Sequence, residues 1–303
     1  MATDGVPRQD LEVCGLWRGI HLDGRRAAVL RRQAVQERAK AVQDVQDICL
    51  VVPSHAFQSV LTTVKPMVSD IVRLVWGTKG LNPESGGFLH QLVYTIFSDK
   101  TPIAVLSGPS FAKEVALDFP TAVTLASKNV EFTTALIKRF HNDHFHLYTS
   151  TDLIGVQLAG VVKNVMAIAV GISDGMGFGA NTRCALMTRG LEELANLCEA
   201  LGGSRDTVMS FAGVGDLILT CTDDQSRNRR FGLALGKGLD RLRAEKDIGQ
   251  AVEGLYNAKQ VYALAKSQGV EMPITQQVYR ILYENVSSRA AVEALLQRVP
   301  KTS

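Results

Sequence analysis

The 303-residue chain lacks the features that mark several large classes of protein. Its five cysteines include no C-x-x-C pair, which argues against a zinc site or a disulfide framework and favours reduced, mostly core-filling thiols. It has no low-complexity tract and no internal repeat of solenoid length. No apolar signal-like stretch opens the chain, and five acidic residues before residue 40 disfavour a transit peptide. We therefore expect a cytoplasmic, globular protein.

The sequence also has little net charge, only +3. Residues 1–40 hold eight Lys/Arg against five Asp/Glu, so the whole excess lies in that stretch. The rest of the chain has no net charge, which disfavours a nucleic-acid-binding protein. With 46% hydrophobic residues, the chain is long and apolar enough for two domains with cores of their own.

Short β-rich runs alternate with helical patterns from residue 45 to about 150. The runs are "ICLVV" (48–52), "RLVW" (73–76), "IAVLS" (103–107), "AVTLA" (122–126) and "FHLYT" (145–149). Continuous apolar strands separated by helices predict a doubly wound α/β domain with a parallel sheet covered on both faces. The first three runs end in "PSH", "GTKG" and "GPS", and ligands of this class bind at the carboxyl ends of strands.

Strand signals stop near residue 153, and long helical patterns continue to the end of the chain. We therefore predict three segments: an atypical N-terminal stretch (1–44), a partial α/β domain (45–152) and an all-α domain (153–303). Ser150 or Asp152 is expected to cap the first helix of the last segment.

Lys163 is the only charged residue between Ile154 and Ile172, where Gln157 and Asn164 are its only strongly polar companions. The apolar positions cover every face of a helix, which predicts a core helix rather than a surface helix. The central lysine and the polar chain around this helix argue against a membrane span. Because a buried, unpaired ammonium is costly, Lys163 either snorkels to the surface or serves chemistry.

Two further polar positions follow predicted strands. Lys79 in "GTKG" is either solvated or reaches an anionic ligand. Ser110 in "SGPSFAKEV" lies at a strand-to-helix turn, where it either caps the helix or contacts a phosphate.

The stretch "AGVGDLILTCTDDQSRNRRFG" (212–232) holds a third polar cluster, with Asp216 after Gly-x-Gly. Four residues crowd the helix start that we predict after Ser226: Arg227, Asn228, Arg229 and Arg230. The cluster is either a solvated face or a site for a small phosphorylated ligand, since arginine binds phosphate through two hydrogen bonds and a helix N-terminus adds to the attraction.

Two motifs are excluded by their context. "GMGFGA" (175–180) matches a dinucleotide fingerprint only in letters, because a buried helix rather than a strand precedes it. The tract "HNDHFH" holds His141, His144 and His146 but has no fourth ligand at a regular spacing, so no metal site is expected.

Together these segments resemble the bacterial NAD(P)-dependent glycerol-3-phosphate dehydrogenases. The matching stretches run in the family's order: "VVPSHAF", "LVWGTKGL", "LSGPSFAKEVA", "PTAVTLAS", "IGVQLAGVVKNVMAIAVGISDGMGFGAN", "GVGDLILTCTDDQSRNRRFG" and "EGLYNAKQV". The resemblance implies a dinucleotide-binding domain at 45–152, a substrate domain at 153–303, and hydride transfer between NAD or NADP and a small phosphorylated substrate, dihydroxyacetone phosphate. A role in phospholipid synthesis and a homodimer are further expectations.

The resemblance also implies roles for individual residues. Lys163 would exchange the proton, helped by Asn164, Asp216 and Thr220, while Lys79 lies beside substrate and nicotinamide. The phosphate end would be held by five residues: Gly108, Ser110, Ser226, Arg227 and Asn228. Positions that contact the cofactor match Lys79, Ala112, Arg227, Ala251 and Glu253.

The pattern breaks at the start of the chain, where the family has a strand, a G-x-G-x-x-G loop and a helix. Residues 1–44 hold only isolated glycines, and "LEVCGLW" echoes the family's second strand weakly. This favours a truncated, internally deleted or frame-shifted product. The alternatives to the enzyme are a non-catalytic remnant that folds or dimerises through its α domain, and another hydroxyacid dehydrogenase of similar architecture.

We therefore predict that the chain binds NADH weakly, is poorly soluble and carries a protease-resistant C-terminal fragment. The Gly-rich loop supplies backbone N–H donors to the pyrophosphate, and each charge-assisted bond contributes about 1.5–3 kcal/mol. Losing two of these hydrogen bonds should weaken the binding of NADH roughly a hundredfold or more. Fluorescence titration of the purified chain with NADH measures this, and micromolar binding would show that residues 1–44 build an alternative cofactor site.

Overall fold

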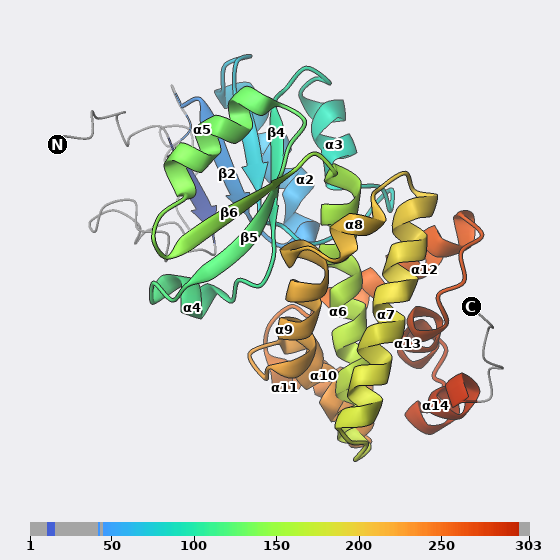
Figure 1. Ribbon diagram of the computed structural model, residues 1–303. Coiled ribbons are helices and arrows are strands. Elements are labelled where there is room, and N and C mark those ends of the chain that lie inside the picture. Colours follow the sequence, from blue (N-terminus) through green and yellow to red (C-terminus); the bar gives the residue numbers. More distant parts are fainter. Residues whose placement is uncertain (1–10, 16–41, 43–44, 297–303) are drawn as a thin grey trace. The chain divides into compact units, whose positions relative to one another are not determined.

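A computed structural model describes residues 11–15, 42 and 45–296. The chain forms two compact units, Met1–Gln157 and Leu158–Ser303. Within the first unit, six described strands form one sheet in chain order (Figure 1). They are β1 (Leu11–Gly15), β2 (Asp47–Val51), β3 (Arg73–Trp76), β4 (Ile103–Ser107), β5 (Thr121–Ala126) and β6 (Phe145–Ser150).

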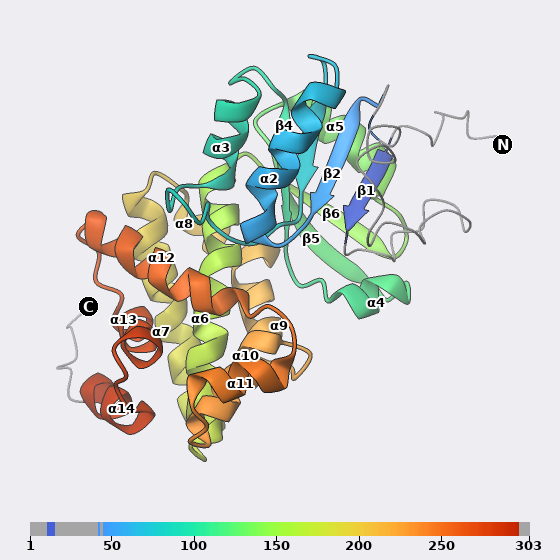
Figure 2. The ribbon, with the colours of Figure 1, turned by 180° about the vertical axis from the view of Figure 1, so that it is seen from behind.

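The helices of the first unit cover both faces of this sheet. On one face, α5 (Val130–Phe140) packs Phe132, Leu136 and Phe140 against buried strand residues. Figures 1 and 2 show α2 (Ser54–Val64) and α3 (Leu89–Ile96) on the opposite face. There Phe57 of α2 meets Trp76 of β3 edge-to-face, with ring centroids 5.6 Å apart. The doubly wound α/β prediction is confirmed.

One ladder departs from the predicted parallel sheet. All other neighbouring strands run parallel, but β4 pairs with β5 antiparallel. A parallel return needs a long crossover, usually a full helix. The connection from β4 to β5 contains only the five-residue helix α4 (Ala112–Ala116), so the chain turns back beside the strand it has left.

The start of the chain contributes a strand as well. Leu11–Gly15, within the stretch that we expected to be atypical, forms β1 and pairs in parallel with β2. The described strands therefore follow one another in chain order and contain no point at which that order reverses. The other expectations for residues 1–44 fall on positions outside the described ones.

The described part of the second unit is helical, as predicted. Its elements are α6 (Leu153–Gly175, which begins in the first unit), α7 (Ala180–Ala200), α8 (Arg205–Val208), a π-helical turn η2 (Phe211–Gly215), α9 (Asp216–Thr222), α10 (Arg227–Gly236), α11 (Arg241–Ile248), α12 (Glu253–Ser267), α13 (Pro273–Tyr283) and α14 (Ser288–Leu296). A short 3-10 turn, η1 (Lys65–Met67), ends α2 in the first unit.

Helix α6 is the predicted core helix. Asp152 caps it, accepting a hydrogen bond from the Gly155 N–H at 2.8 Å. Within the described chain α6 alone has the length and apolarity of a membrane span, yet 89% of that apolar window is buried inside the protein. It ends at Gly175, and α7 starts at Ala180, so "GMGFGA" is a helix–helix turn as predicted.

Helices α6 and α10 make an unusually close backbone contact. A Cβ atom on Gly171 would lie 2.2 Å from the Arg229 carbonyl oxygen, and one on Gly232 would lie 2.2 Å from the Ile168 carbonyl oxygen. Gly175 and Gly236 are blocked in the same way, one helical turn further along. Any side chain at these four positions would push the helices apart, so the glycines set the distance between the two elements that carry Lys163 and Asn228.

Candidate active site

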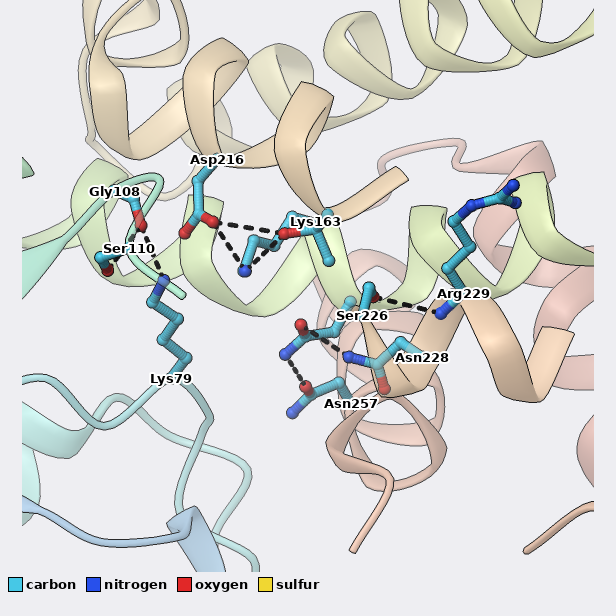
Figure 3. Close-up of polar contacts among 11 residues, drawn as sticks. Lys79, Gly108, Ser110, Lys163, Asp216, Ser226, Asn228, Arg229 and Asn257 are labelled. Atoms are coloured by element: carbon cyan, nitrogen blue, oxygen red, sulfur yellow. Dashed lines mark hydrogen bonds and ion pairs between the residues drawn. The ribbon is translucent and has the colours of Figure 1, made fainter. Parts of the chain in front are cut away.

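Lys163 does not snorkel to the surface. Its ammonium donates hydrogen bonds to the Asp216 carboxylate at 2.8 Å and to the Thr220 hydroxyl oxygen at 2.7 Å (Figure 3). The Lys163 side chain is 8% exposed and that of Asp216 is 2% exposed. The predicted grouping of Lys163, Asp216 and Thr220 is therefore present in the structure.

The local sequence explains how Asp216 reaches this position. The chain enters α9 through the π-helical turn Phe211–Gly215, a geometry that is rare and concentrated at functional sites. Gly213 allows this turn to press against α8, because a Cβ there would lie 2.0 Å from the Val208 carbonyl oxygen. Asp216 then opens α9, and Thr220 follows four residues later on the same helical face.

Burial makes this ion pair interdependent. Removing one partner from a buried pair leaves an uncompensated charge and costs about 3–5 kcal/mol in typical proteins. The pair holds the Lys163 side chain in place on a helix whose other residues are mostly buried and apolar. A group so placed is able to give a proton to an adjacent developing oxyanion and to take it back.

A chain of amides lies next to Lys163 in sequence. Asn228 donates to the Asn164 side-chain oxygen at 2.9 Å, and Asn164 donates to the Asn257 side-chain oxygen at 3.0 Å. The backbone N–H of Gly254 donates to the Asn228 side-chain oxygen at 2.9 Å. All three side chains are buried, and Asn257 is completely so.

The residues at the arginine-rich start of α10 lie in different environments. Ser226 caps α10 as predicted, accepting from the Arg229 N–H at 3.2 Å. Arg227 is partly exposed and donates to the Gln250 side-chain oxygen at 3.4 Å. Arg229 is buried and forms an ion pair with Asp174 of α6 at 2.6 Å, whereas Arg230 is exposed. The four residues therefore do not share one environment, and Arg229 joins α6 to α10 through its ion pair with Asp174.

The turns after the strands of the first unit gather at one edge of the sheet. The Lys79 ammonium and the Ser110 hydroxyl both donate to the carbonyl oxygen of Gly108, at 3.0 and 3.1 Å (Figure 3). Thr78 donates to the Val52 carbonyl oxygen at 2.8 Å, which ties the turn after β3 to the turn after β2. The three turns "PSH", "GTKG" and "GPS" thus lie together at the edge of the sheet that the parallel strands predicted.

Gly108 has a geometric reason to be glycine. Its φ is +153°, and a Cβ would lie 2.9 Å from the Val123 Cα of β5. Ser110 is not the cap of α4, because the cap position belongs to Phe111. The simple N-cap interpretation of Ser110 is therefore wrong.

The remaining predicted positions lie at helix starts or on the surface. Ala112 is exposed at the start of α4, Ala251 is exposed just before α12, and Glu253 opens α12 partly buried. His141 accepts from the Leu147 N–H through Nδ1, and its ring meets that of His146 edge-to-face.

Three residues of the second unit were missed by the sequence interpretation: Gln250, Gly254 and Asn257. The motif "EGLYNAKQV" contains two of them, and its Gly and Asn are three residues apart, which places them on one face of α12. No pattern in the sequence showed that Asn257 pairs with Asn164 from a helix 93 residues away.

Two family models match the chain. One is described as the C-terminus of NAD-dependent glycerol-3-phosphate dehydrogenase and matches residues 152–293, and the other is described as its N-terminus and matches residues 31–133. A glycerol-3-phosphate dehydrogenase (NAD(P)+) of Coxiella burnetii is 52% identical over 261 residues, covering 86% of this chain and 78% of the relative. The Shewanella sediminis enzyme of the same name is 52% identical over 265 residues, covering 87% and 78%.

A solved structure agrees with these relatives. The crystal structure of glycerol-3-phosphate dehydrogenase from Coxiella burnetii aligns with a TM-score of 0.83, over 86% of this chain and 79% of that one. The dinucleotide of such enzymes binds at the carboxyl edge of the sheet. The edge built by Lys79, Gly108 and Ser110 fits a phosphate-bearing group, because a cation and a hydroxyl lie together there.

The buried site makes a prediction for thiol chemistry. Burial raises the pKa of the Cys221 thiol to about 12, although the nearby Lys163 and Arg229 charges act in the opposite direction. Cys221 should therefore stay protonated and unmodified by iodoacetamide at pH 8, while exposed Cys184 reacts. Peptide mass mapping after alkylation of the native chain measures both. Equal labelling of the two thiols would contradict the buried packing around Lys163.

Proposed function

Since the chain belongs to the NAD-dependent glycerol-3-phosphate dehydrogenase family, we propose that Lys163 carries the proton of its reaction. The protein is an NAD(P)-dependent oxidoreductase that interconverts dihydroxyacetone phosphate and sn-glycerol 3-phosphate. The observation that supports Lys163 is its buried position in hydrogen-bond contact with both Asp216 and Thr220.

When bound, a nicotinamide cofactor would supply the hydride for C2 of dihydroxyacetone phosphate in the reduction. Lys163 gives one proton from Nζ to the oxygen that becomes the alcohol, so hydride and proton together complete the C–H and O–H bonds. Asp216 stabilises the ammonium before the transfer, and Thr220 orients Nζ. In the oxidation the amine of Lys163 takes the proton back, and Asn164 is proposed to orient the carbonyl.

We assign the phosphate end to residues at the start of α10. Arg227 is partly exposed and has a planar guanidinium suited to two parallel bonds with a phosphate, while Ser226 and Asn228 flank it at a helix N-terminus. A hydroxyacid carboxylate would also attract Arg227. The 52% identity to glycerol-3-phosphate dehydrogenases favours the phosphate substrate.

For the first unit, we propose that Gly108 and Ser110 contact the substrate and that Lys79 contacts substrate and nicotinamide. Ala112, Arg227, Ala251 and Glu253 are proposed as further cofactor contacts. We place the catalytic and substrate-binding domain at 153–303. The supply of glycerol phosphate for phospholipid synthesis in the cytoplasm, by a homodimer, is the cellular role that this activity suggests.

Replacing Lys163 should abolish the chemical step with little change in substrate binding. We expect Lys163→Ala to lower kcat by about a hundredfold or more, the usual loss when a positioned acid–base group is removed. Oxidation of NADH and NADPH that depends on dihydroxyacetone phosphate, in the purified chain, is the measurement.

A control separates chemistry from folding, because Lys163→Ala removes the ammonium that contacts the buried Asp216 carboxylate. The double variant Lys163→Met with Asp216→Asn removes both charges and should fold. It should remain as inactive as Lys163→Ala while its thermal unfolding is closer to that of the parent. Activity of the double variant within threefold of the parent would end the proposal for Lys163.

Arg227→Ala should weaken substrate binding more than folding, because Arg227 is partly exposed and its one side-chain hydrogen bond here is a long contact with Gln250. Loss of a charge-assisted bond costs about 1.5–3 kcal/mol, or roughly ten- to a hundredfold in the KM for dihydroxyacetone phosphate. Unphosphorylated dihydroxyacetone is the control substrate. If the variant weakened both substrates equally, Arg227 would not bind the phosphate.

A further inference from the structure

Three helices of the second unit are joined by three consecutive hydrogen bonds that begin and end on α12, whose backbone between residues 254 and 257 completes a ring. The series starts at the backbone N–H of Gly254 on α12, passes through Asn228 on α10 and Asn164 on α6, and returns to Asn257 on α12. We call these four groups the amide ring. Figure 3 shows its Asn228 and Asn257 members.

The amide ring has a direction that cannot be reversed. A backbone N–H is only a donor, so the oxygen of Asn228 must face Gly254. The nitrogen of Asn228 must then face the oxygen of Asn164, which turns the nitrogen of Asn164 toward the oxygen of Asn257. One backbone group on α12 therefore decides the orientation of both amides that neighbour the catalytic lysine and the phosphate-binding arginine.

Close packing supports the same bonds. A Cβ on residue 254 would lie 2.8 Å from the Asn228 side-chain oxygen, so only glycine lets that amide reach the backbone N–H. Asn257 is completely buried, and its own nitrogen faces the Gln260 side-chain oxygen at 3.5 Å. In a dry environment an unsatisfied amide costs about 1–3 kcal/mol, so each member of the ring holds the next.

We propose that Gly254 and Asn257 are positioning residues for the reaction, acting through Asn228 and Asn164. Each amide nitrogen carries two hydrogens, and the ring uses one of them on Asn164 and one on Asn228. The second hydrogen on each is thereby fixed in direction and offers a donor to an oxygen of the substrate. The proposal rests on the proposed function of Asn164 and Asn228 as substrate contacts.

The acceptor end of the ring is tested by two substitutions at one position. Asn257→Leu keeps the size but removes the acceptor, so the Asn164 amide loses one of its two hydrogen bonds and is held only by Asn228. We expect the KM for dihydroxyacetone phosphate to rise about tenfold, the value of one oriented hydrogen bond, while the KM for NADH stays within about threefold. Asn257→Asp keeps an acceptor for Asn164 and should restore the KM to within about threefold of the parent.

Thr275→Val is the matched control for a purely structural effect. Thr275 is completely buried in the same unit, donates to Glu193 at 3.0 Å, and lies on α13, which carries no member of the ring. This variant should lower the melting temperature without changing the KM for dihydroxyacetone phosphate. If Asn257→Leu changed only the melting temperature, as Thr275→Val does, or if Asn257→Asp failed to restore the KM, the positioning role would be overturned.

A second measurement tests the hydrogen bonds of the amide ring without enzyme turnover, through the exchange of side-chain amide hydrogens with solvent. In the 15N-labelled full chain, the side-chain NH2 signals of Asn164 and Asn228, assigned with Asn164→Asp and Asn228→Asp, should exchange slowly with solvent. Asn257→Leu should speed exchange of the Asn164 amide at least tenfold, and Gly254→Ala should do so for Asn228. Unchanged exchange in both variants would overturn the ring.

The two measurements distinguish the two levels of the proposal. If the parent does not reduce dihydroxyacetone phosphate but the exchange rates change as expected, the ring stands and the proposed function fails. If the parent turns over normally and neither KM nor exchange changes in Asn257→Leu, the function stands and the positioning proposal fails.

Discussion

A charge on a helix that packs inside the protein must find a partner, and α6 carries two charges, Lys163 in its middle and Asp174 at its C-terminal end. Lys163 and Asp174 are eleven residues apart, about three turns, and so lie on one face of the helix. Asp216 on α9 pairs with the first and Arg229 on α10 with the second. The stretch from 212 to 232 is therefore held along α6 at two ion pairs, and the glycine contacts between α6 and α10 fix how close it lies.

This arrangement accounts for what the sequence could predict. The strand runs, the core helix, its Asp152 cap and the Ser226 cap depend on local periodicity and on the chemistry of the first helical turn, and they agree with the structure. Lys163 was recognisable because a lone charge in an apolar helix is rare. Asp216 and Thr220 were assigned through the resemblance, and their contacts with Lys163 give that assignment a physical basis.

What the sequence could not predict depends on contacts between distant segments. The direction of β5 relative to β4 is decided by the length of the connecting helix, not by the strand residues, which look the same in either direction. Arg229 and Arg227 have the same side chain two positions apart, yet one is buried against Asp174 and the other is partly exposed. Their positions around the α10 helix decide which arginine is buried, and amino-acid composition alone does not distinguish them.

The same reasoning explains why buried polar groups are so frequent around Lys163. Apolar side chains alone would not orient the Lys163 ammonium, because hydrophobic and dispersion contacts have no preferred direction. Hydrogen bonds have direction, and buried amides that are linked in series from a backbone N–H cannot reverse their orientation without losing a buried bond. Ion pairs thus hold α9 and α10 along α6, and the amide ring fixes the orientation of the side chains between α6, α10 and α12. A site built in this way gains precision from residues such as Gly254 and Asn257, for which neither charge nor hydrophobicity signals a role.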